Sequence, residues 1–125
     1  MPVITEGLNL GDLLKYEAPN LYSRDQLTIA AGQNLVLGAI VGIDTLTEKV
    51  KALDPAATDG TEVAAGVLTA AVDATLIDRP DGVLIVRHAV VADHALTWPV
   101  GITAPQKAAA IAQLKALGVL VRHAV

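Results

Sequence analysis

The sequence predicts a mainly β domain with one short C-terminal α-helix and an extended N-terminal arm. From Leu27 onward, short apolar segments alternate with turn residues, which is typical of strands. One pair of helix start and stop signals brackets residues 104–117. At 125 residues the chain has the length of one domain with a modest core.

Residues 1–22 are interrupted by prolines and glycines at positions 2, 7, 11 and 19, so no regular element of normal length fits them. The segment is nevertheless apolar enough to dock on a partner. We therefore expect a docking arm over residues 1–22 that is dispensable for folding, and a folded domain over residues 23–125. A first core strand is the alternative for the arm. The candidate anchors are its large aliphatic side chains Ile4, Leu8, Leu10 and Leu13.

Strands are expected at residues 27–30, 35–43, 49–53, 63–72, 83–91 and 119–122, with a core of small aliphatic side chains. Turns are expected at Asp54-Pro55, Asp59-Gly60 and Asp81-Gly82. The glycine pair Gly38 and Gly42 indicates a close backbone approach or a bend within a strand.

The predicted helix begins with a capping box, in which Thr103 is followed three residues later by Gln106. Pro105 suits the first turn, and Gly118 stands where a left-handed C-terminal cap belongs. The residues at helical spacing on one face are Lys107, Ala110, Ile111, Leu114 and Leu117.

Composition argues against several classes of function. The net charge of −4, with one Trp, two Tyr and no Phe, does not suit a nucleic-acid surface. The chain has no Cys, which excludes disulfides and thiolate metal sites. The longest apolar run, residues 35–43, is under half of the about 20 residues that a membrane span needs. With no secretory signal pattern at its start, we expect a soluble protein made in the cytoplasm.

Residues that could carry catalysis are scattered. His88, His94 and His123 share no metal-ligand spacing, and Ser23, the sole serine, lacks the glycines of a nucleophile elbow. We expect no catalytic residue, no metal site and no cofactor. Trp98 and Pro99, between a strand-like region and the helix, are expected to pack in the core or at a subunit contact.

Several landmarks occur in a characteristic order. Residues 23–25 and 32–42 precede a central segment, residues 59–68 (DGTEVAAGVL), and residues 96–99 (LTWP) and 114–122 (LKALGVLVR) follow it. From about residue 23 to 122 the chain resembles the lambda-type head decoration proteins of tailed bacteriophages.

The resemblance implies a β-clip fold, in which a long bent β-ribbon closes into a partial barrel with a small helical appendix. It also implies homotrimers at three-fold or quasi-three-fold positions on the outer surface of the expanded capsid. There they would bind the major capsid protein through N-terminal segments and brace the shell against DNA pressure.

Two other readings remain open. One is a different phage structural β-scaffold, from the tail or baseplate, or a small cellular one. The other is a trimeric nucleotide hydrolase of the dUTPase type, since Gly42-Ile43-Asp44 matches a fragment of that substrate-binding motif. The residues that complete the motif do not follow, and the chain lacks a glycine-rich phosphate-binding tail.

Overall fold

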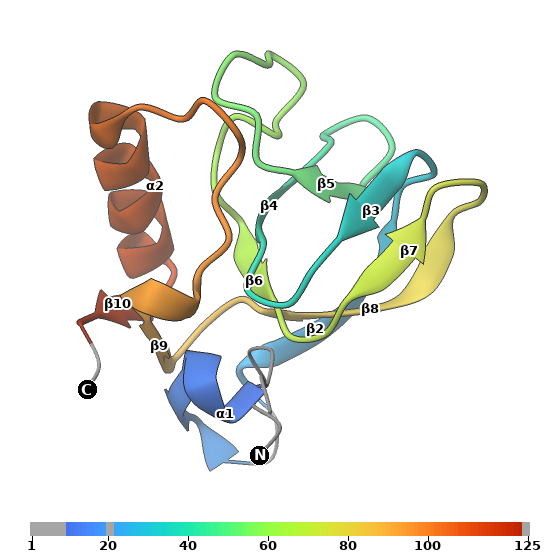
Figure 1. Ribbon diagram of the computed structural model, residues 1–125. Coiled ribbons are helices and arrows are strands. Elements are labelled where there is room, and N and C mark those ends of the chain that lie inside the picture. The colour runs from blue at the N-terminus through green and yellow to red at the C-terminus, as the bar shows by residue number, and fades with distance from the viewer. Residues whose placement is uncertain (1–9, 20–21, 124–125) are drawn as a thin grey trace, which may run out of the picture.

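The computed structural model describes residues 10–19 and 22–123 and confirms a mainly β architecture with one longer C-terminal helix (Figure 1). Its elements are α1 Leu10–Leu13, β1 Leu14–Glu17, β2 Arg24–Ile29, β3 Gln33–Leu35, β4 Ile40–Ile43, β5 Val50–Ala52, β6 Gly66–Leu68, β7 Val72–Ala74, β8 Arg79–Ile85, β9 Ala89–Ala92, the 3₁₀ helix η2 Asp93–Ala95, α2 Ala104–Ala116 and β10 Val119–Arg122.

Five strands form a barrel in the order β2-β5-β4-β6-β8. β2 and β8 form its most extended ladder, from Arg24 opposite Ile85 to Ile29 opposite Arg79. The resemblance implied a partial barrel, whereas this barrel closes. It does so through a parallel contact between β2 and β5, where Ile29 lies opposite Val50.

A bent two-stranded ribbon runs through the barrel wall. β4 pairs with β6, and the continuation of the same two segments pairs β3 with β7, all antiparallel. The predicted strands 35–43 and 63–72 are therefore each broken in two. The bend lies at Gly38, whose φ of 81° favours glycine. The bent ribbon agrees with the fold implied by the resemblance.

A second sheet, in the order β1-β9-β10, lies beside the barrel with α2 next to it (Figure 1). β9 and β10 run parallel, which requires the crossover that α2 supplies. The predicted strand 83–91 breaks between β8 and β9 at residues 86–88, where His88 has a φ of 48°. The break lets the chain leave the barrel and enter the second sheet.

The barrel wall is shared between two hydrophobic clusters. Neighbouring residues of a strand point to opposite faces, and β4, β6 and β8 each supply both clusters in this way. The first cluster, between barrel, second sheet and α2, receives Ile40, Val67 and Ile85. The second, among the barrel strands, receives their neighbours Val41, Leu68 and Leu84. Burial on both faces explains why β4 and β6 are continuous apolar runs.

The helix signals are confirmed. The Thr103 hydroxyl accepts a hydrogen bond from the Gln106 amide at 3.2 Å, and Gln106 Oε1 accepts one from the Thr103 amide at 2.9 Å. Gly118 caps the other end with a φ of 91°. The buried face is narrower than predicted, because Ala110 and Leu114 are buried while Leu117 is 41% exposed.

One predicted turn is wrong. Asp81 and Gly82 lie inside β8, with Gly82 opposite Leu27 of β2. The chain turns earlier, at residues 75–78, where Asp73 Oδ1 accepts from the Thr75 amide at 3.0 Å and Asp78 Oδ1 from the Ala31 amide at 2.7 Å. Side-chain acceptors thus take the place of an Asp-Gly hairpin.

The N-terminal segment differs from a simple extended arm. Residues 10–17 form α1 and β1, and β1 pairs antiparallel with β9, with Leu14 opposite Val91 and Glu17 opposite Ala89. Residues 10–17 pack on the domain because Leu13 is fully buried and fixes α1 against the first cluster. Two of the predicted anchors, Ile4 and Leu8, lie outside the described residues. None of the described helices is long and apolar enough to cross a membrane.

Gly42→Ala is expected to lower the free energy of unfolding by about 1 to 3 kcal/mol or more, as overpacked core sites do. An added Cβ would lie 2.6 Å from Thr61 Cα and 2.7 Å from the Thr61 carbonyl oxygen, and backbone cannot move aside. Urea denaturation measures the loss. Gly101→Ala is the control, because nothing lies within 4 Å of its added Cβ and only its φ of 81° costs energy. Equal losses in the two variants would contradict the close approach.

Candidate interaction surface

A bidentate ion pair ties the N-terminal strand to the barrel. Arg24 Nη2 lies 2.7 Å from Glu17 Oε1, and Arg24 Nε donates to Glu17 Oε2 at 2.9 Å. Ser23, fully buried, donates its hydroxyl to the same oxygen at 2.6 Å. The hydrogen bond from Arg24 lowers the pKa of Glu17 below its ordinary value. β1 is therefore held to β2 as well as to β9.

A second group of contacts joins Tyr22, Arg87 and His88. The guanidinium of Arg87 donates to both Asp25 carboxylate oxygens, at 2.8 and 3.0 Å, and to the Tyr22 carbonyl at 2.6 Å. The hydrogen bond to Asp25 raises the pKa of Arg87. Arg87 also stands over the Tyr22 ring at 5.2 Å, and the same ring lies 5.2 Å from the His88 ring.

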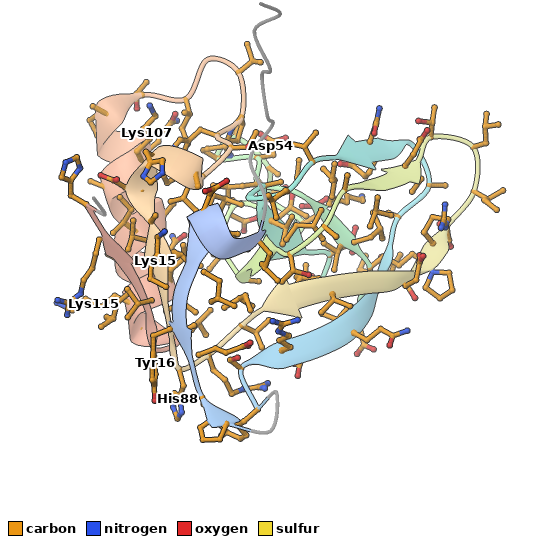
Figure 2. All side chains as sticks on the ribbon, turned by 60° about the horizontal axis from the view of Figure 1, so that its bottom comes forward. Lys15, Tyr16, Asp54, His88, Lys107 and Lys115 are labelled. Carbon is orange, nitrogen blue, oxygen red and sulfur yellow. The ribbon has the colours of Figure 1, made fainter. Side chains whose placement is uncertain are left out.

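These contacts build an exposed surface beside the start of the described chain. Tyr16 and Tyr22 are 59% and 55% exposed, although both are large and partly apolar. In Figure 2, Lys15 and Tyr16 lie on β1, and His88 lies at the same end of the molecule as Tyr16. Exposed tyrosine and arginine side chains are enriched in protein interfaces. We call this surface the N-terminal face: Lys15, Tyr16, Tyr22, Arg87 and His88.

Sequence reasoning missed the N-terminal face. The signal was present, because both tyrosines of the chain fall within residues 16–22, on either side of Pro19. Arg87 and His88 could not be assigned to this surface from sequence, since they come from the distant break between β8 and β9.

The other predicted site residues are distributed as follows. Leu10 is partly buried against the first cluster, close to Leu13 within α1. Trp98 is half-buried at the edge of the same cluster, and the Lys107 ammonium of α2 lies 5.9 Å from its ring centroid. Pro99 is also half-buried and accepts a hydrogen bond from the Ile102 amide at 3.3 Å. Trp98 thus packs beside α2.

The side chains that could take part in catalysis or metal binding lie apart from one another. His123 Nδ1 lies 3.4 Å from Asp93 Oδ2, while the His88 ring is tilted by 49° against the Tyr22 ring and His94 is exposed. Over residues 10–19 and 22–123, no three His, Cys, Asp or Glu side chains gather closely enough to hold a metal ion.

A comparison with protein families gives a match over residues 3–119 to the bacteriophage lambda head decoration protein D family. The chain belongs to this family. Membership indicates a structural protein of the phage head with a role in capsid decoration. The match covers the N-terminal segment from residue 3 on, as well as both hydrophobic clusters and all of α2. A comparison with curated proteins gives no match.

Proposed function

We propose that this head decoration protein binds the outer surface of the expanded capsid as homotrimers at three-fold or quasi-three-fold sites and stabilises the shell against DNA pressure. Its partner would be the major capsid protein of the same phage, and synthesis would take place in the host cytoplasm. The family match carries the proposal.

We assign capsid contact to the N-terminal face together with residues 1–9. The first described element, α1, starts at Leu10, so residues 1–9 directly precede it in the chain. Ile4 and Leu8 are the proposed anchors in this segment. Leu13 is fully buried in the first cluster, so its role here is to fix α1, with Leu10 beside it, rather than to bind the capsid.

In a trimer, contacts with the capsid that are weak individually would together be sufficient for attachment. A segment that becomes ordered on binding loses about 2 to 5 kcal/mol to that ordering. Three segments on one trimer act at a high effective concentration, which raises overall binding by about 10² to 10⁴ without new contacts. A protein of 12.9 kDa can in this way bind a shell firmly through small surfaces.

The test is electron microscopy of expanded, undecorated shells incubated with the purified protein. We expect protrusions centred on the three-fold and quasi-three-fold positions, and a higher rupture temperature for decorated than for bare shells. Unexpanded shells are the control and are expected to stay bare. Density on tails or baseplates alone, or shells equally stable with and without protein, would contradict the proposal.

A further inference from the structure

Two residues of the N-terminal face, Lys15 and Tyr16, lie on a strand that has little support of its own. β1 has four residues, none of them fully buried, and it forms the edge of its sheet beside β9. Its ladder with β9 is irregular between Leu14 and Tyr16. A strand with so few buried contacts is prone to local opening, so its position depends on the contacts at its two ends.

The start of β1 is held by Leu13, and its end is held by a group of hydrogen bonds. The carboxylate of Glu17, the last residue of β1, accepts from the Ser23 hydroxyl at 2.6 Å and from two nitrogens of Arg24 at 2.9 and 2.7 Å. We call Glu17, Ser23 and Arg24 the Glu17 clamp. Ser23 is fully buried, and the Glu17 and Arg24 side chains are only 21% and 24% exposed. A guanidinium fork on a carboxylate fixes orientation as well as distance.

The Glu17 clamp rests on the most extended ladder of the barrel. Arg24 starts β2 and lies opposite Ile85 of β8. The barrel therefore sets the position of Arg24, and Glu17 passes this position on to β1.

The Glu17 clamp also joins the two parts of the N-terminal face. Glu17 directly follows Tyr16, and Ser23 directly follows Tyr22, whose carbonyl accepts from Arg87 at 2.6 Å. A further link is the hydrogen bond from the Ala18 amide to the His88 carbonyl, at 3.1 Å. The clamp is the side-chain contact that keeps the β1 part of the face beside the part formed by residues 22, 87 and 88.

The charges around the Glu17 clamp favour its closed state. The hydrogen bond from Arg24 lowers the pKa of Glu17, and the same bond raises the pKa of Arg24, so both groups are charged at neutral pH. Arg87 is paired with Asp25 at 2.8 Å, which leaves Arg24 to compensate Glu17. The other titratable groups on α1, on β1 and next to β9 are Asp12, Lys15, Tyr16, Tyr22 and His88.

We propose that Arg24 is a positioning residue for capsid attachment. Through Glu17 it holds β1 so that the two residues of the N-terminal face on this strand stand beside the other three. This rests on the proposed function and names the residue that orders its contact surface. A surface that is ordered in advance binds more tightly, because less free energy is spent on ordering it during binding.

Arg24→Met is expected to weaken attachment to expanded shells by about 30-fold, because a loss of about threefold per subunit, typical of one ion pair, multiplies over three subunits. Arg24→Lys keeps the charge but not the fork and should recover part of the loss. Arg79→Met is the matched control, since Arg79 lies at the other end of the β2–β8 ladder and pairs with Asp81 at 2.9 Å. It should attach like wild type. Co-sedimentation with undecorated shells, well below the melting temperature of every variant, measures attachment.

The pH profile separates positioning from general stability. Because the pKa of Glu17 is lowered, its contribution is fully present above the ordinary value of 4.5 and is lost as the pH falls through the lowered pKa. Wild-type protein should attach better than Glu17→Gln at neutral pH, and the ratio of the two should approach one in acid. Acid effects on the shells cancel in this ratio. Asp81→Asn should keep the wild-type profile, although Arg79 lowers the pKa of Asp81 in the same way.

Hydrogen exchange of the free protein gives an independent readout. Arg24→Met should speed the exchange of the amides of residues 14–17 and leave those of β4 and β6 unchanged. Equal attachment of Arg24→Met and wild type, or equal losses in Arg24→Met and Arg79→Met, would overturn the proposal and leave the proposed function standing. If wild-type protein never attaches to shells, the proposed function fails and Arg24 positions no capsid contact. Faster exchange at residues 14–17 would then still show that the Glu17 clamp orders β1.

Discussion

Deletion of residues 1–9 is expected to abolish attachment of the protein to expanded shells while leaving its melting temperature unchanged. The described elements that pack the two clusters all begin at Leu10 or later, so the deletion leaves the contacts among them in place. It removes the proposed anchors Ile4 and Leu8 from three subunits at once. Attachment should fall by at least about 100-fold, the lower end of what linked binding events contribute.

Co-sedimentation of the shortened protein with undecorated shells measures this loss, with circular dichroism and a thermal melt beside it. Ile4→Asn/Leu8→Asn should reproduce the deletion, and Thr5→Asn, a polar change in the same segment, should not. Shortened protein that still saturates the shells would show that the N-terminal face or another part of the folded domain supplies the binding.

Leu13→Ala is expected to lower the free energy of unfolding by about 2 to 5 kcal/mol, the range for a fully buried leucine. Leu13 is 0% exposed and holds α1 against the cluster that also contains Val91 and Leu114. Domains of this size are stable by about 5 to 15 kcal/mol, so the change removes a large share of the total. Urea denaturation measures this loss, with the slope of the unfolding free energy against urea concentration expected to be the same in variant and wild type.

Leu10→Ala is the matched control, because Leu10 is a leucine of the same short helix that is only partly buried. Its loss should be clearly smaller. Deleting residues 1–22 should destabilise the domain more than Leu13→Ala, since it also removes β1 and the Glu17–Arg24 ion pair. A domain that keeps its stability without residues 1–22 would show instead that α1 and β1 only rest on the surface.

Sequence patterns predicted the elements whose signals are local. The capping box at Thr103 and the cap at Gly118 depend on residues close in sequence, and the structure has both. The boundaries of the long strands were not predictable in the same way. Residues 35–43 and 63–72 are almost entirely apolar, since β4 and β6 within them are buried on both faces, and such a run does not show where its backbone bends.

The residues that make up the interaction surface were even harder to predict from the sequence than the strand boundaries. The N-terminal face joins Tyr16 and Tyr22 to Arg87 and His88, which are more than 60 residues away along the chain. The apolar character of Leu10 and Leu13 was visible, but apolarity does not distinguish a side chain buried in its own core from one that binds a partner. Only the packing of α1 against the first cluster separates the two roles.

The antiparallel ladder of β2 and β8 has a mechanical consequence. β2 starts next to the N-terminal face, and β8 starts at the opposite end of the ladder, after the turn between β7 and β8. The two strands pair from Arg24–Ile85 to Ile29–Arg79. A force that pulls the turn between β7 and β8 away from the N-terminal face acts along both strands. It therefore acts across their hydrogen bonds, which are perpendicular to the strand direction. The bonds are then loaded together in shear and cannot be unzipped one at a time. An expanded shell under DNA pressure that pulled on these two places would load the barrel in its strongest direction.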